Sequence, residues 1–132
     1  LAMEVGGTEH GFRFIQLPFN LMLDQAYLTK NHSVNGKTIS LLEAAQAFNL
    51  GVFTSVPLLQ GKLLTANVMP EFGDYSTSVR LLQFVRSTPG VTAPLIGQKS
   101  ESHVTENMDI MKIPPLSESE FNELLKNMVN RS

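Results

Sequence analysis

Three short apolar segments alternate with helix-forming segments, and this alternation restricts the fold of the chain more than any other feature. Runs rich in Phe, Val and Ile, typical of buried strands, occupy residues 12–17, 51–56 and 91–96. A segment with helical signals follows each run. Strands that alternate with helices pair in parallel, because two parallel strands need a crossover connection of a dozen or more residues. The order predicts an α/β protein whose three strands are adjacent and parallel in chain order.

Capping residues set the expected helix boundaries. Ser40 with Glu43, and Ser117 with Glu120, form capping-box patterns ahead of apolar residues at helical spacing. Helices are expected over residues 41–50, 79–87 (with N-caps among 76–78), 101–111 and the segment after Ser117. Residues 1–5 fit the last turn of another helix. Residues 20–35, which end in NHSVNG, and residues 65–75 have no clean period, so we expect loops there.

The length of the chain fits part of a larger architecture. A complete (β/α)₈ barrel takes roughly 250 residues, and this chain, with 132, has about half of that. An open part of a barrel would expose two unpaired strand edges and an apolar inner surface, both of which are liabilities in water. No repeat or linker divides the chain, so we expect one partial domain over residues 1–132.

Charge and residue types exclude several classes of function. The formal net charge of −2 offers no basic field for nucleic acid, and no run approaches the ~20 apolar residues of a membrane span. The lack of cysteine excludes disulfides and thiolate sites, and the three histidines share no metal-ligand spacing. No basic-then-apolar leader begins the chain, so the expected location is the cytoplasm.

Residues 91–107, VTAPLIGQKSESHVTEN, form the most informative motif. A short strand leads into a loop with one glycine, and Ser100 opens a helix with Val104, Met108 and Met111 on one face. Such a loop directs backbone N–H groups and a helix N-terminus at one point, which suits a phosphate. Lys99 adds a positive charge there. The alternative interpretation is a solvated helix face without a ligand.

Two further motifs follow the first and second strands. FRFIQLPFNLM contains Gln16 near the strand end, and SVPLLQGKLL follows the second strand. The amide of Gln16 offers both a donor and acceptors. Taken alone, Gln16 could simply cap a strand end, and residues 57–61 could be an ordinary turn between a strand and a helix.

The three motifs, in this order and at this spacing, resemble the last three β/α units of the aldo-keto reductases. The resemblance covers nearly the whole chain. It implies the C-terminal half of a (β/α)₈ TIM barrel, with about three parallel strands and their helices, plus one extra C-terminal helix. The activity it implies is hydride transfer between NADP(H) and a carbonyl or alcohol.

The resemblance also implies a set of residues that contact NADP(H). Gln16 would hydrogen-bond the nicotinamide carboxamide, and Ser55 stands where many family members carry an aromatic that stacks on the nicotinamide. The loop that wraps the pyrophosphate would contain Val56, Leu58, Gln60 and Gly61. The 2′-phosphate and ribose would be lined by Gly97, Gln98, Lys99 and Ser100. The adenine would meet His103, Glu106 and Asn107.

The catalytic residues of the family are expected outside this chain. The proton-donating tyrosine and its lysine, aspartate and histidine partners belong to the first half of the barrel, so no catalytic residue is assigned, and neither Tyr27 nor Tyr75 replaces the donor. Two functions stay open: the NADP(H)-binding half of an oxidoreductase, and a non-catalytic, self-associating half-barrel that acts as a binding or structural module. The expected partner is the missing N-terminal half-barrel or a second copy of this chain.

Overall fold

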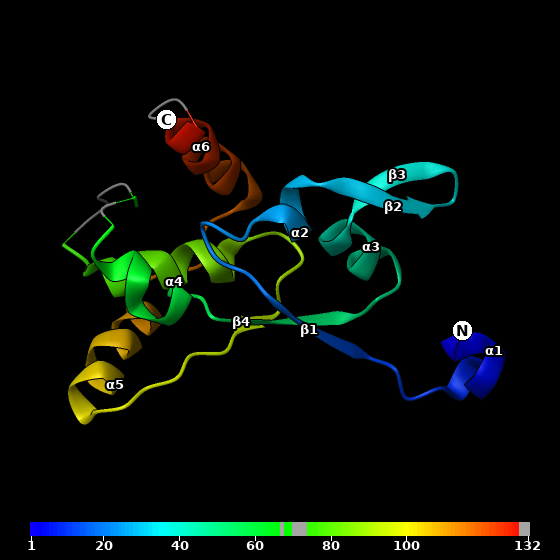
Figure 1. Ribbon diagram of the computed structural model, residues 1–132, viewed down its shortest axis with the longest axis horizontal. Helices are drawn as coiled ribbons and strands as arrows, with labels where there is room; N and C mark the ends of the chain where they lie inside the picture. The colour runs from blue at the N-terminus through cyan, green and yellow to red at the C-terminus, as the bar shows by residue number, and fades with distance from the viewer. Residues whose placement is uncertain (67, 70–73, 130–132) are drawn as a thin grey trace.

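A computed structural model describes residues 1–66, 68–69 and 74–129 of the chain (Figure 1). The expected loop over residues 65–75 lies in part outside the described residues. The α-helices are α1 (Ala2–Gly6), α2 (Gln25–Leu28), α3 (Leu41–Ala47), α4 (Thr77–Ser87), α5 (Glu101–Met108) and α6 (Glu118–Val129). The 3-10 helices are η1 (Gly7–Glu9), η2 (Leu59–Leu64) and η3 (Asp109–Lys112). The strands are β1 (Phe14–Pro18), β2 (Lys30–Val34), β3 (Lys37–Ser40), β4 (Gly51–Ser55) and β5 (Ala93–Pro94).

The central sheet confirms the predicted strand order. Its order is β1-β4-β5, and both pairs are parallel. The expected third strand over residues 91–96 is reduced to β5, because Pro94 has no N–H to donate to the ladder. Hydrogen bonds from Thr92 N to Val52 O (2.8 Å) and from Leu95 N to Thr54 O (2.7 Å) extend the contact on either side of β5.

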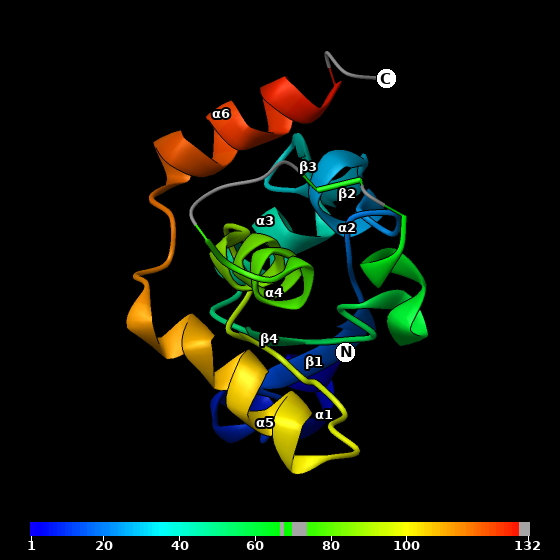
Figure 2. The same ribbon diagram turned by 90° about the vertical axis from the view of Figure 1, so that its left-hand side faces the viewer.

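Among the described residues, helices cover one face of this sheet and leave the other open. The side chains of Val52 and Thr54 are fully buried on that face, where α3 and α4 lie over the strands (Figures 1 and 2). On the opposite face, Phe14 is 59% exposed. A sheet that is covered by helices on one face and open on the other is the arrangement expected for part of a barrel wall.

Helix α4 forms the centre of the core. Nine of its eleven side chains are buried, because the sheet lies on one side and residues 113–116 form hydrogen bonds with α4 on another. Phe84 stacks on Phe19 with ring centroids 6.3 Å apart, and it meets Phe121 of α6 at 5.3 Å. The helix begins after Ser76, whose side chain accepts a hydrogen bond from Val79 N, so the predicted N-cap is confirmed.

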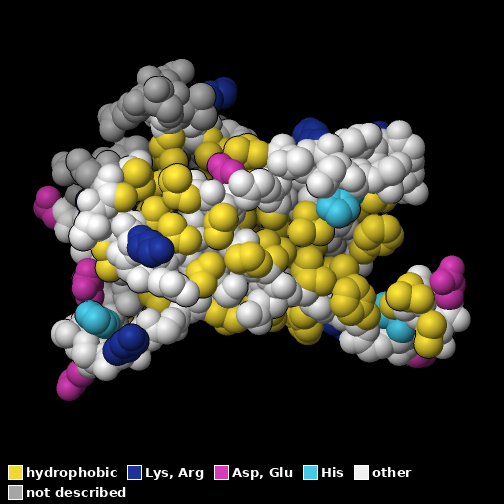
Figure 3. Space-filling view, in the orientation of Figure 1, with side chains coloured by type: hydrophobic (Ala, Val, Ile, Leu, Met, Phe, Trp, Pro, Cys, Tyr) yellow, Lys and Arg dark blue, Asp and Glu magenta, His cyan; other side chains and the backbone are white. Residues whose placement is uncertain are grey.

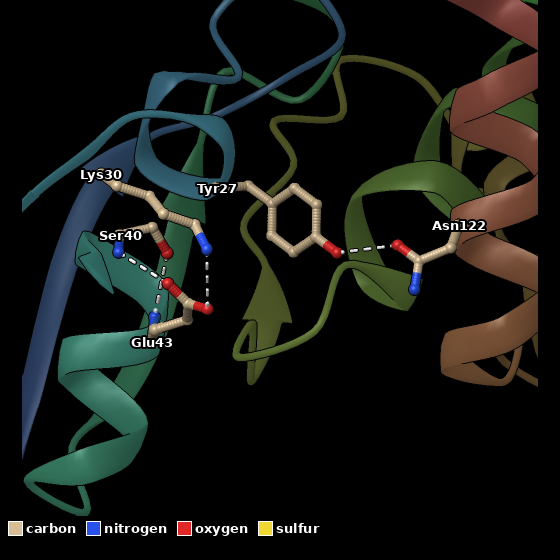
Figure 4. Close-up of polar contacts among 5 residues, drawn as sticks. All are labelled: Tyr27, Lys30, Ser40, Glu43 and Asn122. Carbon is tan, nitrogen blue, oxygen red and sulfur yellow. Dashed lines mark hydrogen bonds and ion pairs between the residues drawn. The ribbon is translucent and has the colours of Figure 1, made fainter. Parts of the chain in front are cut away.

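Helix α6 is the predicted additional helix, and a hydrogen bond and a ring contact from Tyr27 hold it in place. Its start has the expected capping box, with Ser117 N donating to Glu120 Oε2 at 2.8 Å and Glu120 N donating to Ser117 Oγ at 3.3 Å. Tyr27 donates its hydroxyl to Asn122 Oδ1 at 3.1 Å (Figure 4) and meets the ring of Phe121 edge-on. Burial raises the pKa of Tyr27, as expected of a packing residue.

The expected loop over residues 20–35 is wrong in part. Residues 25–28 form α2, and β2 pairs with β3 in an antiparallel hairpin. The turn between them is Asn35-Gly36, and both residues have positive φ, 52° and 75°, as a two-residue hairpin turn requires. No apolar alternation marks this strand in the sequence, because the hairpin buries little: within β2 only His32 and Val34 are half-buried.

Helix α5 is shorter than the expected helix over residues 101–111. It ends at Met108 and continues as the 3-10 turn η3. The predicted apolar stripe of Val104, Met108 and Met111 is exposed, by 42%, 53% and 71% respectively. The stripe therefore covers no core within the described part of the chain.

The capping box of α3 makes a pH-dependent contribution to stability. Ser40 N donates to Glu43 Oε2 at 2.7 Å, and Lys30 lies 3.9 Å from the same carboxylate (Figure 4). The hydrogen bond from Ser40 lowers the pKa of Glu43 below its usual 4.5. Because the pKa in the folded state is the lower one, the charged form stabilises the fold above about pH 4.5, and this contribution is lost as the pH falls through the folded-state pKa.

We therefore expect Glu43→Gln to be less stable than the wild type at pH 7 and to approach it as the pH falls below about 4.5. Glutamine keeps the acceptor and removes only the charge. Urea unfolding between pH 7 and pH 3 measures the difference. Glu123→Gln removes the same charge from an exposed position that caps no helix, and a pH-independent difference for Glu43→Gln would contradict the assignment.

Candidate functional site

The predicted site residues lie on the strands of the central sheet or in the segments that follow them. Because β1, β4 and β5 are parallel, their carboxyl ends lie at the same edge. Ser55 ends β4, and the other predicted residues follow β4 or β5, whereas Gln16 lies in the middle of β1. In α/β folds, ligands bind outside the carboxyl ends of parallel strands, where loops from several strands meet.

Gln16 and Ser55 lie on the same, open face of the sheet. Gln16 pairs with Phe53, and Pro18 pairs with Ser55. Residues that are paired across parallel strands point to the same face, and residues two apart in a strand share a face. Gln16 is exposed and Ser55 is half-buried. Both side chains are therefore on the side that would be the interior of a barrel, close to its carboxyl end.

The loop after β4 has an unusual backbone. Val56, Leu59, Gln60 and Gly61 all have positive φ, at 51°, 48°, 55° and 86°. For a β-branched residue such as Val56 this conformation is strained, and strain of this kind gathers at functional loops. Leu59 N donates to Val56 O, and Gly61 N donates to Leu58 O, each at 2.9 Å. The N–H groups of Val56 and Leu58 have no hydrogen-bond partner in the described part of the chain.

Asn20 holds this loop in place, and the sequence motifs did not single it out. Its side chain is fully buried. Nδ2 donates to Val56 O at 3.0 Å, and Oδ1 accepts hydrogen bonds from Met22 N (2.9 Å) and Leu23 N (3.1 Å). Asn20 thus joins the chain after β1 to the strained residue after β4. The available signal was a single polar residue within the apolar run PFNLML.

Residues 97–100, which follow β5 and are predicted to bind the 2′-phosphate, are open to solvent. Gly97, Gln98, Lys99 and Ser100 are exposed, and the Ser100 side chain accepts a hydrogen bond from His103 N at 3.3 Å. The predicted N-cap of the helix is therefore confirmed. The Lys99 ammonium group and the first turn of α5 lie next to each other in the chain, so an anion could approach both without displacing a packed side chain.

Glu106 and Asn107 face different surroundings, although they were predicted to meet adenine together. Glu106 is exposed, whereas Asn107 is 6% exposed and accepts a hydrogen bond from the Ser78 hydroxyl through Oδ1. That bond joins α5 to the first turn of α4. Because Oδ1 already accepts this hydrogen bond, Asn107 would contact an adenine base through its amide N–H donors.

Comparison with known proteins identifies the architecture. No known family profile and no curated protein sequence matches the chain. Among solved structures, the aldo-keto reductase AKR11C1 from Bacillus halodurans (holo form) is similar, with a TM-score of 0.64 and 16% identity over 89% of this chain. The match covers 43% of that chain. This chain therefore has the fold of part of an aldo-keto reductase barrel, and the resemblance seen in the sequence is confirmed for the fold.

The described residues contain neither a membrane-spanning helix nor a cluster of metal ligands. No helix there is long and apolar enough to cross a membrane. No group of three or more His, Asp or Glu side chains within residues 1–66, 68–69 and 74–129 is placed to hold a metal ion.

Proposed function

We propose that this chain is the NADP(H)-binding part of an aldo-keto-reductase-like oxidoreductase. The observation that carries the proposal is the arrangement at the carboxyl edge of the sheet. Three segments with the family's cofactor motifs lie on or directly after three adjacent parallel strands, in a fold that matches part of an aldo-keto reductase. The matched reductase is a holo form, which suits the choice of a nucleotide cofactor.

Different segments of the chain would contact different parts of the cofactor. Lys99 and the first turn of α5 would attract the 2′-phosphate, and the free N–H groups of the loop after β4 would face the pyrophosphate. Gln16 would hold the nicotinamide on the open face of the sheet. Bound NADP(H) would supply the hydride. This chain would orient the cofactor, while the proton donor would come from the part of the barrel that the chain does not contain.

A non-catalytic binding or structural module is the second candidate function. The observation that favours it is the exposed apolar face of the sheet, since a surface of that kind serves association. Binding of an adenosine phosphate at the carboxyl edge of the sheet separates the two candidates, because only the first requires it. A cytoplasmic location stays a prediction under either.

Replacement of Lys99 by alanine tests the assignment of the 2′-phosphate. An exposed charge pair contributes up to about 1 kcal/mol, so the affinity for 2′,5′-ADP should fall about two- to five-fold. The affinity for 5′-AMP, which lacks the 2′-phosphate, should stay nearly unchanged. Added salt should reduce the effect. NMR titration of both ligands measures the difference.

Lys37→Ala is the matched control, since it removes an exposed lysine from the hairpin strand β3, away from the carboxyl edge of the central sheet. It should change neither affinity. Equal weakening of 2′,5′-ADP and 5′-AMP by Lys99→Ala would show that Lys99 does not contact the 2′-phosphate.

A further inference from the structure

Ser78 and Asn107 form a buried contact between two helices of the candidate site. Ser78 lies in the first turn of α4, and Asn107 lies in the last turn of α5. Each residue is only 6% exposed. The Ser78 hydroxyl donates a hydrogen bond to Asn107 Oδ1, and the two residues are 29 positions apart in the sequence. The contact therefore fixes the oxygen end of the Asn107 amide.

The position of Ser78 explains why the oxygen end of the amide faces α4. The N-terminus of a helix carries a partial positive charge, because its first backbone N–H groups have no partner within the helix. The amide oxygen of Asn107 is the negative end of the side-chain dipole, so this field favours it over the nitrogen. A serine hydroxyl can donate or accept, and in this arrangement it donates.

The nitrogen end of the Asn107 amide is left to contact a ligand. Within the described residues, Asn107 Nδ2 has no hydrogen-bond partner. The side-chain polar atoms there that are both enclosed and unpartnered are Thr54 Oγ1 and the Arg80 atoms Nε and Nη1. Asn107 Nδ2 is not among them, so it reaches the surface although the residue as a whole is buried. The side chain thus presents N–H donors in a fixed direction.

The surroundings of this donor suit a nucleotide. Figure 3 shows histidine, basic and acidic side chains together on the lobe that α5 forms. Lys99 directly precedes this helix, and Asn107 lies six residues after its first residue, Glu101. Six residues of α-helix rise about 9 Å. An adenosine phosphate can span this separation between its phosphate and the far edge of its base.

We infer that Ser78 is a positioning residue that makes Asn107 a hydrogen-bond donor to adenine. Adenine has ring nitrogens that accept hydrogen bonds and an exocyclic amino group that donates them. Held by Ser78, Asn107 donates from Nδ2 to one of the two ring nitrogens that flank the amino group, N1 or N7, and does not accept from the amino group. The inference rests on the proposed function and adds the residue that selects which atoms of the base are recognised.

The inference is tested by NMR titration of the full chain with 5′-AMP and its 1-deaza and 7-deaza analogues. Each analogue replaces one ring nitrogen by C–H and so removes one acceptor. In the wild type, one analogue should bind about three- to ten-fold more weakly than 5′-AMP, because one hydrogen bond is lost. In Ser78→Ala the amide is free to turn, so that analogue and 5′-AMP should bind with nearly equal affinity. A merely structural role would weaken all three nucleotides by the same factor.

Ser87→Ala is the matched control for the loss of a buried hydroxyl. Ser87 belongs to the same helix, is 7% exposed, and accepts a hydrogen bond from Leu116 N at 2.9 Å. This variant should be less stable than the wild type and still discriminate between 5′-AMP and the analogue. A second measurement needs no variant: in the wild type, the side-chain amide resonances of Asn107 should shift more with 5′-AMP than with the weaker analogue.

Three results would overturn the inference, with different consequences for the proposed function. A wild-type chain that binds no adenosine phosphate at millimolar concentration would remove both. Equal binding of all three nucleotides by the wild type would show that Asn107 contacts neither N1 nor N7. Unchanged discrimination in Ser78→Ala would show that Ser78 only joins two helices. The last two results would leave the proposed cofactor site standing.

Discussion

Replacement of Phe84 by alanine should leave most of the chain unfolded at room temperature. Phe84 is 1% exposed and contacts the rings of Phe19 and Phe121, so it joins the chain after β1, helix α4 and helix α6. Loss of a buried phenylalanine side chain costs about 3–5 kcal/mol. A small domain with an incomplete core has little more stability than that to lose. Urea unfolding followed by circular dichroism measures the change.

Phe48→Ala is the matched control for this substitution. Phe48 is 63% exposed at the end of α3, so its loss should change the free energy of unfolding by no more than about 0.5 kcal/mol. An unfolding midpoint of Phe84→Ala close to that of the wild type would show that α4 is not the centre of the core.

Replacement of Asn20 by alanine should both destabilise the chain and loosen the loop after β4. Three hydrogen bonds of a fully buried side chain would be lost, which costs about 2–4 kcal/mol. Val56 would also lose the contact that holds its strained backbone. Hydrogen exchange should therefore accelerate at the Leu59 and Gly61 amides in addition to the fall in stability.

Asn31→Ala provides the comparison, because Asn31 is an exposed asparagine in β2. It should change neither the stability nor the exchange of the loop by a measurable amount. If Asn20→Ala lowers the stability but leaves exchange at Leu59 and Gly61 as fast as before, Asn20 has a packing role and does not position the loop.

Local signals were sufficient for most of the fold. Ser40 with Glu43, Ser100, and Ser117 with Glu120 predicted helix starts that the structure confirms, because an N-cap depends on residues only three positions apart. The alternation of strands and helices predicted the parallel order of the sheet. The β2–β3 hairpin differs from the loop that the sequence predicts, because it buries little and its Asn35-Gly36 turn suits a loop equally well.

The candidate site was predictable only where it depends on a continuous segment. The loop at residues 97–100 and the start of α5 lie where the motif placed them. The contact between Asn20 and Val56 spans 36 positions in the sequence, and nothing local indicates it. The same applies to Asn107, because its inward orientation depends on Ser78 of another helix.

Titration of the isolated chain with 2′,5′-ADP, followed residue by residue by NMR, tests the proposed cofactor site most directly. Binding should be weak, near millimolar, because the ligand lacks the nicotinamide half and the loops are not held by the rest of a barrel. The shifts should concentrate on residues 97–107, with Lys99 and the first turn of α5 affected most. A folded chain without shifts in this segment at millimolar ligand would contradict the account.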